Sequence, residues 1–172
     1  MTTLSTLQKP LLQLGSQEAE VKELQTLLQK YGYSLVEDGI FTPKTKDAVL
    51  HFQATKFLKA DGIVGDKTWR ALYTGAPVDM PVLRLGSCEK EVKLVQSILT
   101  KLQLEVPSDE PSSYYPTQLV PYYMGEIDSV YGEKTESAVK KFQKNSGLIV
   151  DGIVGEKTWY SLSQHSYLII FL

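Results

Sequence analysis

The sequence is poor in the residues that most often build catalytic and metal sites. It has one cysteine, Cys88, and two histidines, His51 and His165, among 172 residues. A single cysteine excludes an intramolecular disulfide framework. A catalytic zinc site needs three protein ligands, and two histidines far apart in the chain do not indicate one. We therefore expect no metal, no cofactor and no catalytic residues.

Charge of one sign and long apolar runs are also missing. The formal net charge is −2, with 22% charged and 42% hydrophobic residues, which is ordinary for a globular protein and gives no reason to expect a nucleic-acid partner. The C-terminal SYLIIFL (166–172) is far shorter than the roughly 20 residues of a membrane helix. The N-terminal MTTLSTLQKPLLQLG has no basic segment before a long apolar core. We expect neither a membrane span nor a signal peptide.

The chain does contain an internal repeat. Three stretches recur: DGIVGDKTW (61–69) as DGIVGEKTW (151–159), LQLGSQEAEVKELQTLL (12–28) as LRLGSCEKEVKLVQSIL (83–99), and DGIFTPKTKDAVLHFQ (38–53) as DSVYGEKTESAVKKFQ (128–143). The offset grows from 71 to 90, so the second copy carries 19 extra residues between positions 104 and 128. We predict an N-terminal tail (1–9), a first domain (10–75), a glycine- and proline-flanked linker (76–81), a second domain (82–164) and an apolar tail (165–172).

Each predicted domain contains three segments with apolar residues at helical spacing. The inward-facing residues are Val21, Leu24, Leu28 and Tyr31 with Val92, Val95, Leu99 and Leu102; Thr45, Ala48, Val49 and Phe52 with Thr135, Ala138, Val139 and Phe142; and Trp69, Leu72 and Tyr73 with Trp159 and Leu162. No alternating strand pattern of convincing length is present. The predicted fold class is all-α: two homologous three-helix units in tandem, each with a buried tryptophan.

The repeated Asp-Gly stretches are interpreted first as helix starts. An aspartate can accept a nearby backbone N–H, and glycine accepts a positive φ. The predicted N-caps are Thr42, Gly65, Gly132 and Gly155, each followed by a proline or an acidic residue, as suits a first helical position. Val64 and Trp69 have the spacing of a hydrophobic staple, as do Val154 and Trp159. The alternative is direct ligand contact, with the candidate residues Asp61, Gly62, Asp151 and Gly152.

Together these motifs resemble the peptidoglycan-binding domain found beside bacterial and phage cell-wall hydrolases. The match covers LQTLLQKYGY, DGIFTPKTKDAVLHFQ and KADGIVGDKTWRAL in the first copy, and DSVYGEKTESAVKKFQKNSGLIVDGIVGEKTWYSL in the second. The resemblance implies a three-helix fold that docks on murein, at the cell wall or outside the cytoplasm. Thr42 and Ser129 stand where the family usually has glycine. A cytoplasmic or phage-encoded protein stays open as an alternative.

The insertion is the most individual part of the chain. It covers about 105–123 and includes VPSDEPSSYYPTQLVPYY (106–123), with four candidate ligand-binding tyrosines: Tyr114, Tyr115, Tyr122 and Tyr123. Tyrosine presents a flat apolar face and a polar tip, and long loops are often functional. The alternative is a lid that covers the domain's own core.

The predicted function is non-catalytic binding of peptidoglycan through two tandem modules, which raises avidity on a repetitive polymer. A separate cell-wall hydrolase would be a suitable partner. Two alternatives remain open: a protein-interaction or assembly module that keeps the fold without murein binding, and a muralytic enzyme. For the enzyme, Glu126 and Asp128 are a pair of carboxylates close together in the sequence. The oligomeric state does not follow from the sequence.

Overall fold

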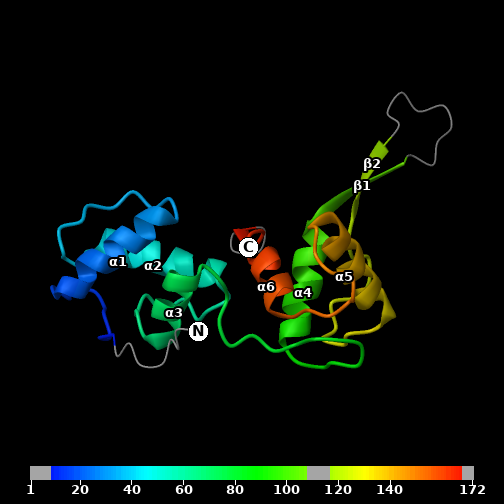
Figure 1. The fold of residues 1–172 in the computed structure, drawn as a ribbon, viewed down its shortest axis with the longest axis horizontal. Coiled ribbons are helices and arrows are strands. Elements are labelled where there is room, and N and C mark those ends of the chain that lie inside the picture. The colour runs from blue at the N-terminus through cyan, green and yellow to red at the C-terminus, as the bar shows by residue number, and fades with distance from the viewer. Residues whose placement is uncertain (1–8, 108–116, 168–172) are drawn as a thin grey trace. The chain divides into compact units, whose positions relative to one another are not determined.

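The computed structural model describes residues 9–107 and 117–167. These ranges contain α1 (Ala19–Lys30), α2 (Pro43–Thr55), α3 (Asp66–Thr74), α4 (Glu91–Lys101), β1 (Gln103–Pro107), β2 (Thr117–Pro121), α5 (Glu133–Asn145) and α6 (Glu156–Ser163), drawn in Figure 1. The chain divides into two compact units, and the boundary falls between Val78 and Asp79. Unit 1 contains α1 to α3 and unit 2 contains α4 to α6. The predicted all-α class, with two homologous three-helix units, is confirmed.

The helix starts lie where the sequence predicts them. The N-caps of α2, α3, α5 and α6 are Thr42, Gly65, Gly132 and Gly155. Thr42 Oγ1 accepts a hydrogen bond from the Thr45 backbone N–H at 3.3 Å, which satisfies one of the free donors of the first turn. Three of these helices have an acidic residue in the first turn, where the helix dipole favours negative charge.

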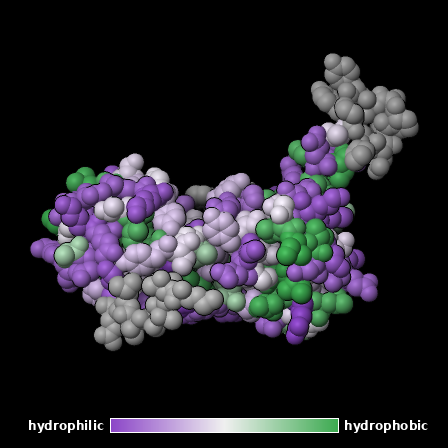
Figure 2. Space-filling model, in the orientation of Figure 1, coloured by the Kyte–Doolittle hydropathy of each residue, from purple (hydrophilic) through white to green (hydrophobic). Residues whose placement is uncertain are grey.

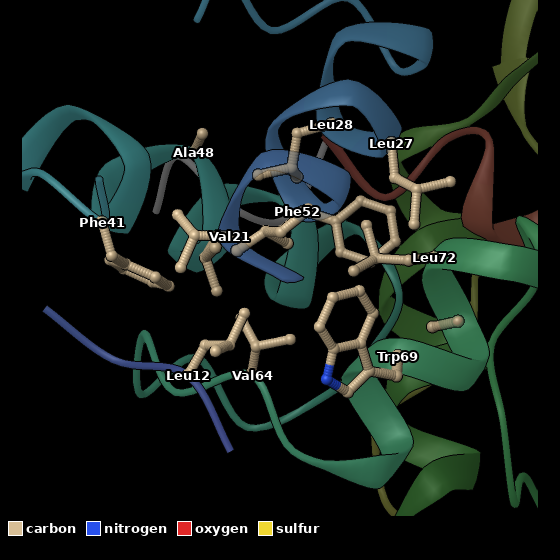
Figure 3. Close-up of a cluster of buried hydrophobic side chains, with 13 residues drawn as sticks. Leu12, Val21, Leu27, Leu28, Phe41, Ala48, Phe52, Val64, Trp69 and Leu72 are labelled. Carbon is tan, nitrogen blue, oxygen red and sulfur yellow. The ribbon is translucent and has the colours of Figure 1, made fainter. Parts of the chain in front are cut away.

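Trp69 belongs to the buried core of unit 1 and is 2% exposed (Figure 3). Its indole Nε1 donates to the Pro10 carbonyl oxygen at 3.0 Å. Leu12 and Val64 exchange two backbone hydrogen bonds of 3.1 and 2.8 Å, and both side chains are fully buried. The segment that precedes α1 is therefore fastened to the start of α3 by backbone and side-chain contacts.

Unit 2 repeats this arrangement with its own residues. Trp159 is also 2% exposed, and its Nε1 donates to the Pro81 carbonyl oxygen at 2.7 Å. Leu83 and Val154 exchange backbone hydrogen bonds of 3.2 and 2.8 Å. The predicted burial of both tryptophans is confirmed, and so is the burial of the two valines that precede their helix caps.

Two tyrosines that the helical pattern places in the core of unit 1 are only partly buried. Tyr31 and Tyr73 are each 37% exposed. The Tyr31 hydroxyl donates to the Leu72 carbonyl oxygen at 2.7 Å, and the Tyr73 hydroxyl donates to the Glu23 carboxylate. A tyrosine hydroxyl needs a polar partner, so these rings lie at the rim of the core.

The described ends of the insertion form two short antiparallel strands, which the sequence pattern did not predict. β1 and β2 pair antiparallel from Gln103 opposite Pro121 to Pro107 opposite Thr117. The end of β2 is tied to α4, because the Tyr122 and Tyr123 backbone N–H groups donate to the Leu102 and Leu99 carbonyl oxygens at 3.1 Å each. Each strand has only five residues, too few for a clear alternating pattern.

The C-terminal tail is described only in part. Ser166 is buried, and its hydroxyl donates to the Ser163 carbonyl oxygen at 2.8 Å. Tyr167 is exposed. Residues 168–172 lie outside the described residues, so the domain bounds and the tail proposed from the sequence stay predictions.

Candidate functional site

The Asp-Gly stretch of unit 1 forms a turn that a buried glutamine of α2 holds in place. Gln53 is 1% exposed. Its Nε2 donates to Asp61 Oδ1 at 3.2 Å and to the Ile63 carbonyl oxygen at 2.9 Å, while its Oε1 accepts from the Gly62 N–H at 2.9 Å. Asp61 Oδ1 also accepts from the Ile63 N–H at 3.0 Å. Gly62 has φ of +73°, which glycine adopts without strain.

Unit 2 builds the same turn from Gln143 of α5. Its Nε2 donates to Asp151 Oδ1 at 2.8 Å and to the Ile153 carbonyl oxygen at 3.0 Å, and its Oε1 accepts from the Gly152 N–H at 2.9 Å. Asp151 Oδ1 accepts from the Ile153 N–H at 2.8 Å. The repeated stretch therefore has a structural function first. Ligand contact by Asp61, Gly62, Asp151 and Gly152 stays a prediction.

The same device occurs before the second helix of each unit. In unit 1, Gln25 of α1 donates to Asp38 Oδ1 at 2.8 Å and to the Ile40 carbonyl oxygen at 3.1 Å. In unit 2, Gln96 of α4 donates to Asp128 Oδ1 at 2.9 Å and to the Val130 carbonyl oxygen at 3.1 Å. We call these four turns, each fixed by one buried glutamine, the clamped turns.

The sequence interpretation did not identify the four glutamines. Each lies on the inward face of its helix and is at most 1% exposed; they are Gln25, Gln53, Gln96 and Gln143. A polar residue that repeats among inward-facing apolar positions is the signal that could have found them, because a buried amide must be hydrogen-bonded. Their aspartate partners lie 8 to 32 residues further along the chain.

The hydrogen bonds of the clamped turns lower the pKa of all four aspartates. For Asp38 and Asp128 the largest cause is the glutamine amide, followed by the backbone N–H of the residue two positions later. For Asp61 and Asp151 the backbone N–H of Ile63 or Ile153 is the largest cause of the lowered pKa. Bonds to the ionised form favour that form. These carboxylates therefore act as fixed acceptors and are poorly suited to donate a proton.

The residue after each Asp-Gly or Asp-Ser pair presents an aliphatic side chain. Ile40, Ile63 and Val130 are 43%, 36% and 48% exposed, and Ile153 is half-buried. Leu14 and Leu85, which occupy equivalent positions before α1 and α4, are 51% and 54% exposed. Figure 2 shows hydrophobic areas on the visible face of unit 2, so apolar residues are exposed on that unit.

Three chain segments lie side by side where these aliphatic residues occur. In unit 1 the segment 11–16 bonds to the turn before α3 through Leu12 and Val64, and to the turn before α2 through Gly15 N–H and the Phe41 carbonyl oxygen at 2.9 Å. Unit 2 has the corresponding bond from Gly86 N–H to the Tyr131 carbonyl oxygen at 2.9 Å. Each unit therefore holds its two clamped turns on either side of one leading segment.

The predicted tyrosines occupy different environments. Tyr114 and Tyr115 lie outside the described residues. Tyr122 is half-buried, with its hydroxyl accepting from Asn145 Nδ2 at 2.9 Å and its ring edge-on to Phe142 at 6.0 Å between centroids.

Tyr123 is part of the core of unit 2 and is 4% exposed. Its hydroxyl donates to the Glu126 carbonyl oxygen at 2.6 Å and accepts from Gln96 Nε2 at 3.3 Å. The expectation that Tyr123 presents its ring to a ligand does not fit this burial. The hydroxyl completes the clamped turn instead.

The residues considered for catalysis are dispersed. His51 is half-buried, and its Nδ1 lies 2.7 Å from the Tyr33 hydroxyl. Burial lowers the pKa of His165, which packs against Phe142, and Cys88 is exposed. Over residues 9–107 and 117–167, no group of three or more His, Cys, Asp or Glu side chains is placed to hold a metal ion. Across the same ranges, no helix has the length and apolar character to cross a membrane.

Comparison with known proteins gives one family model, described as "Putative peptidoglycan binding domain", which matches residues 17–72 and 117–162. A probable N-acetylmuramoyl-L-alanine amidase of Bacillus licheniformis is 33% identical over 86% of this chain and 43% of its own length. The amidase CwlL of the same organism is 30% identical over 86% of this chain and 44% of its own length. A zinc D-Ala-D-Ala carboxypeptidase of Streptomyces albus G is 35% identical over 45% of this chain and 33% of its own length.

These relatives correct the function predicted from the sequence. Non-catalytic binding was expected to be the whole function, but the relatives are named as amidases and a carboxypeptidase, so that prediction is wrong. The chain spans less than half the length of these curated relatives. Peptidoglycan as a partner and a cell-wall association are supported by the family model and these relatives.

Proposed function

The chain belongs to the peptidoglycan-binding domain family, and on that premise we propose that it takes part in peptidoglycan hydrolysis of the amidase type. In this proposal the two units bind the cell wall and hold an amidase activity at its substrate. The bond cleaved is the one that the relatives' name specifies, between N-acetylmuramoyl and L-alanine.

The observation that carries this proposal is the double match to one family model, at residues 17–72 and 117–162. Two binding units on one chain raise the effective concentration of the second unit once the first has bound a repetitive polymer. An activity coupled to such a pair stays on the wall through many cleavage events. The two amidase relatives, each matched over 86% of this chain, favour the amidase reaction over other cell-wall chemistry.

In this proposal the cleavage step belongs to a catalytic part that acts together with the two units. The clamped turns support that division, because their aspartates are fixed acceptors with lowered pKa values. A general acid needs a pKa near the working pH. The proposed place of action is the cell wall.

The test is a hydrolysis assay on purified sacculi with three proteins: this chain, an isolated amidase catalytic domain, and that domain joined to this chain. Release of new amino groups and loss of turbidity are followed at low protein concentration. We expect the joined protein to act faster than the isolated domain. Added free chain should slow the joined protein, because the two compete for the wall, and should leave the isolated domain unaffected.

Equal rates for the joined and isolated domains, with no competition by the free chain, would refute this proposal. Clearing of sacculi by the chain alone would show that the chain itself cleaves peptidoglycan, which would refute the assignment of cleavage to a separate catalytic part. A pelleting assay of the chain with sacculi gives the binding measurement on which both readouts depend.

A further inference from the structure

Both units expose aliphatic residues at equivalent positions that their folding does not require to be apolar. In unit 1 these are Leu14, Ile40 and Ile63, and in unit 2 they are Leu85, Val130 and Ile153. Five of the six are between 36% and 54% exposed, and Ile153 is half-buried. Single exposed apolar residues are common on protein surfaces. Here three exposed aliphatic residues recur at equivalent positions in both units. Incomplete burial within either unit does not explain why these positions are apolar, so a further reason is needed.

The backbone of four of these residues is fixed while the side chain stays in contact with solvent. In unit 1 the Ile40 N–H donates to Asp38 at 3.0 Å and its carbonyl accepts from Gln25 at 3.1 Å. The Ile63 N–H and carbonyl are held in the same way, at 3.0 and 2.9 Å. Unit 2 holds Val130 at 2.9 and 3.1 Å, and Ile153 at 2.8 and 3.0 Å. These side chains are positioned before any ligand arrives, which reduces the entropic cost of binding.

The leucine of each set lies in a tight turn between the two clamped turns. In unit 1 the Ser16 N–H donates to the Gln13 carbonyl at 2.9 Å, and Gly15 has φ of +92°. In unit 2 the Ser87 N–H donates to the Arg84 carbonyl at 2.9 Å, and Gly86 has φ of +91°. The hydrogen bonds from each leading segment to the two flanking turns bring the three aliphatic residues of a unit onto neighbouring segments.

We propose that these residues form two equivalent binding surfaces, aliphatic surface 1 (Leu14, Ile40, Ile63) and aliphatic surface 2 (Leu85, Val130, Ile153), for the methyl-bearing muramoyl-alanyl portion of peptidoglycan. The inference rests on the function proposed above and specifies where and what each unit binds. The N-acetylmuramoyl-L-alanine unit in the relatives' names carries the methyl groups of acetyl and alanine. Branched aliphatic side chains suit such groups, since burial of apolar area drives the contact.

The composition of the surfaces separates this ligand from a bare sugar chain. Sugar rings are commonly bound by stacking on flat aromatic faces, and none of the six residues is aromatic. The turn aspartates beside them are already engaged by glutamine and backbone donors. Each surface therefore offers three aliphatic side chains for apolar contact.

The experiment measures binding of the full chain to purified sacculi by pelleting. The surface 1 variant is Leu14→Gln, Ile40→Thr and Ile63→Thr; the surface 2 variant is Leu85→Gln, Val130→Thr and Ile153→Thr. Threonine keeps the β-branch that suits the extended backbone. The control variant is Leu119→Gln and Tyr160→Gln, which removes two exposed apolar residues of unit 2, 63% and 48% exposed, on β2 and α6. Soluble N-acetylmuramoyl-L-alanine and an N-acetylglucosamine oligomer serve as competitors.

We expect either surface variant to bind about tenfold more weakly, and the combined variant about a hundredfold, because partial burial of several aliphatic groups is lost at each site. The control should bind as the parent does, and N-acetylmuramoyl-L-alanine should compete better than the glucosamine oligomer. Thermal melts check the fold of each variant. If a triple variant melts early, the pair Leu14→Gln and Leu85→Gln, which leaves all clamped turns unchanged, must still weaken binding.

Several results would overturn the inference. Normal sacculus binding by the combined variant would exclude these surfaces while leaving the proposed function intact. An equal loss in the control variant would show general hydrophobic adhesion, and better competition by the glucosamine oligomer would exclude the alanyl contact. A change of oligomeric state in the surface variants would mean that a second copy occupies the surfaces. Absence of sacculus binding by the parent chain would refute the proposed function, and this inference with it.

Discussion

Replacing Gln143 by leucine tests whether the clamped turns hold each unit together. The substitution keeps the approximate volume of a side chain that is 1% exposed. It removes the amide that bonds to Asp151, Ile153 and Thr158, at 2.8, 3.0 and 3.2 Å, and the acceptor of the Gly152 N–H at 2.9 Å. Gly152 is buried, so the substitution leaves its N–H without the hydrogen-bond acceptor that Gln143 supplies.

The expected loss of stability follows from these four bonds. Each contributes about 1 kcal/mol net, with the bond to the exposed Asp151 carboxylate counted no higher because solvent weakens it. The Thr158 hydroxyl still reaches the Ile153 carbonyl at 3.2 Å, and the leucine gains some apolar burial. We therefore expect unit 2 to lose about 3 kcal/mol, a large part of the 5–15 kcal/mol by which a native domain is stable.

The two tryptophans make the measurement specific to one unit. The sequence has one tryptophan in each unit, Trp69 and Trp159, so a Trp69→Phe background leaves Trp159 fluorescence as the reporter of unit 2 in a urea titration. The matched control is Gln164→Leu, which changes an exposed glutamine and should shift stability by less than about 0.5 kcal/mol. The pKa of Asp151 should rise toward its ordinary value in Gln143→Leu, because the amide bond helps to lower it. A stability loss below about 1 kcal/mol with an unchanged pKa would refute the clamp.

Three further predictions concern single features. Ser129 has φ of +68°, where unit 1 has Gly39 at +75°, so Ser129→Gly should stabilise unit 2 by about 0.5–1 kcal/mol in urea unfolding; a lower urea midpoint would contradict this. The folded state lowers the pKa of four aspartates, Asp38, Asp61, Asp128 and Asp151. Their contribution to stability is therefore complete above the ordinary pKa of 3.8, and it decreases as the pH falls through the pKa of the folded state. Asp61→Asn with Asp151→Asn should flatten the acid limb of a stability–pH curve. Tyr123→Phe should cost about 1–2 kcal/mol through its lost hydroxyl bonds, whereas Tyr122→Phe should cost less than about 0.5 kcal/mol; equal melting temperatures would contradict the difference in burial.

The sequence by itself determined the features that depend on local physics. Helical spacing, N-caps and tryptophan burial act over a few residues, so Thr42, Gly65 and the position of Trp69 could be predicted from neighbouring residues. The repeat multiplied each signal, since two copies of one pattern reduce the chance of a misleading match. The family followed from the same motifs. Their cap and core residues carry no information on catalysis, so the expectation of a purely non-catalytic function was wrong.

Only the tertiary structure decided which polar groups meet. Gln96 bonds to Asp128, which lies 32 residues later and beyond both strands, and no local rule connects the two. Tyr123 belonged by sequence to a tyrosine-rich insertion, yet its ring lies in the core because the end of β2 is fastened to α4. The strands themselves are short and depend on each other for pairing. The positions of exposed Leu14, Ile40 and Ile63 on neighbouring segments also depend on chain reversal, because residues far apart in sequence become neighbours only when backbone hydrogen bonds close the fold.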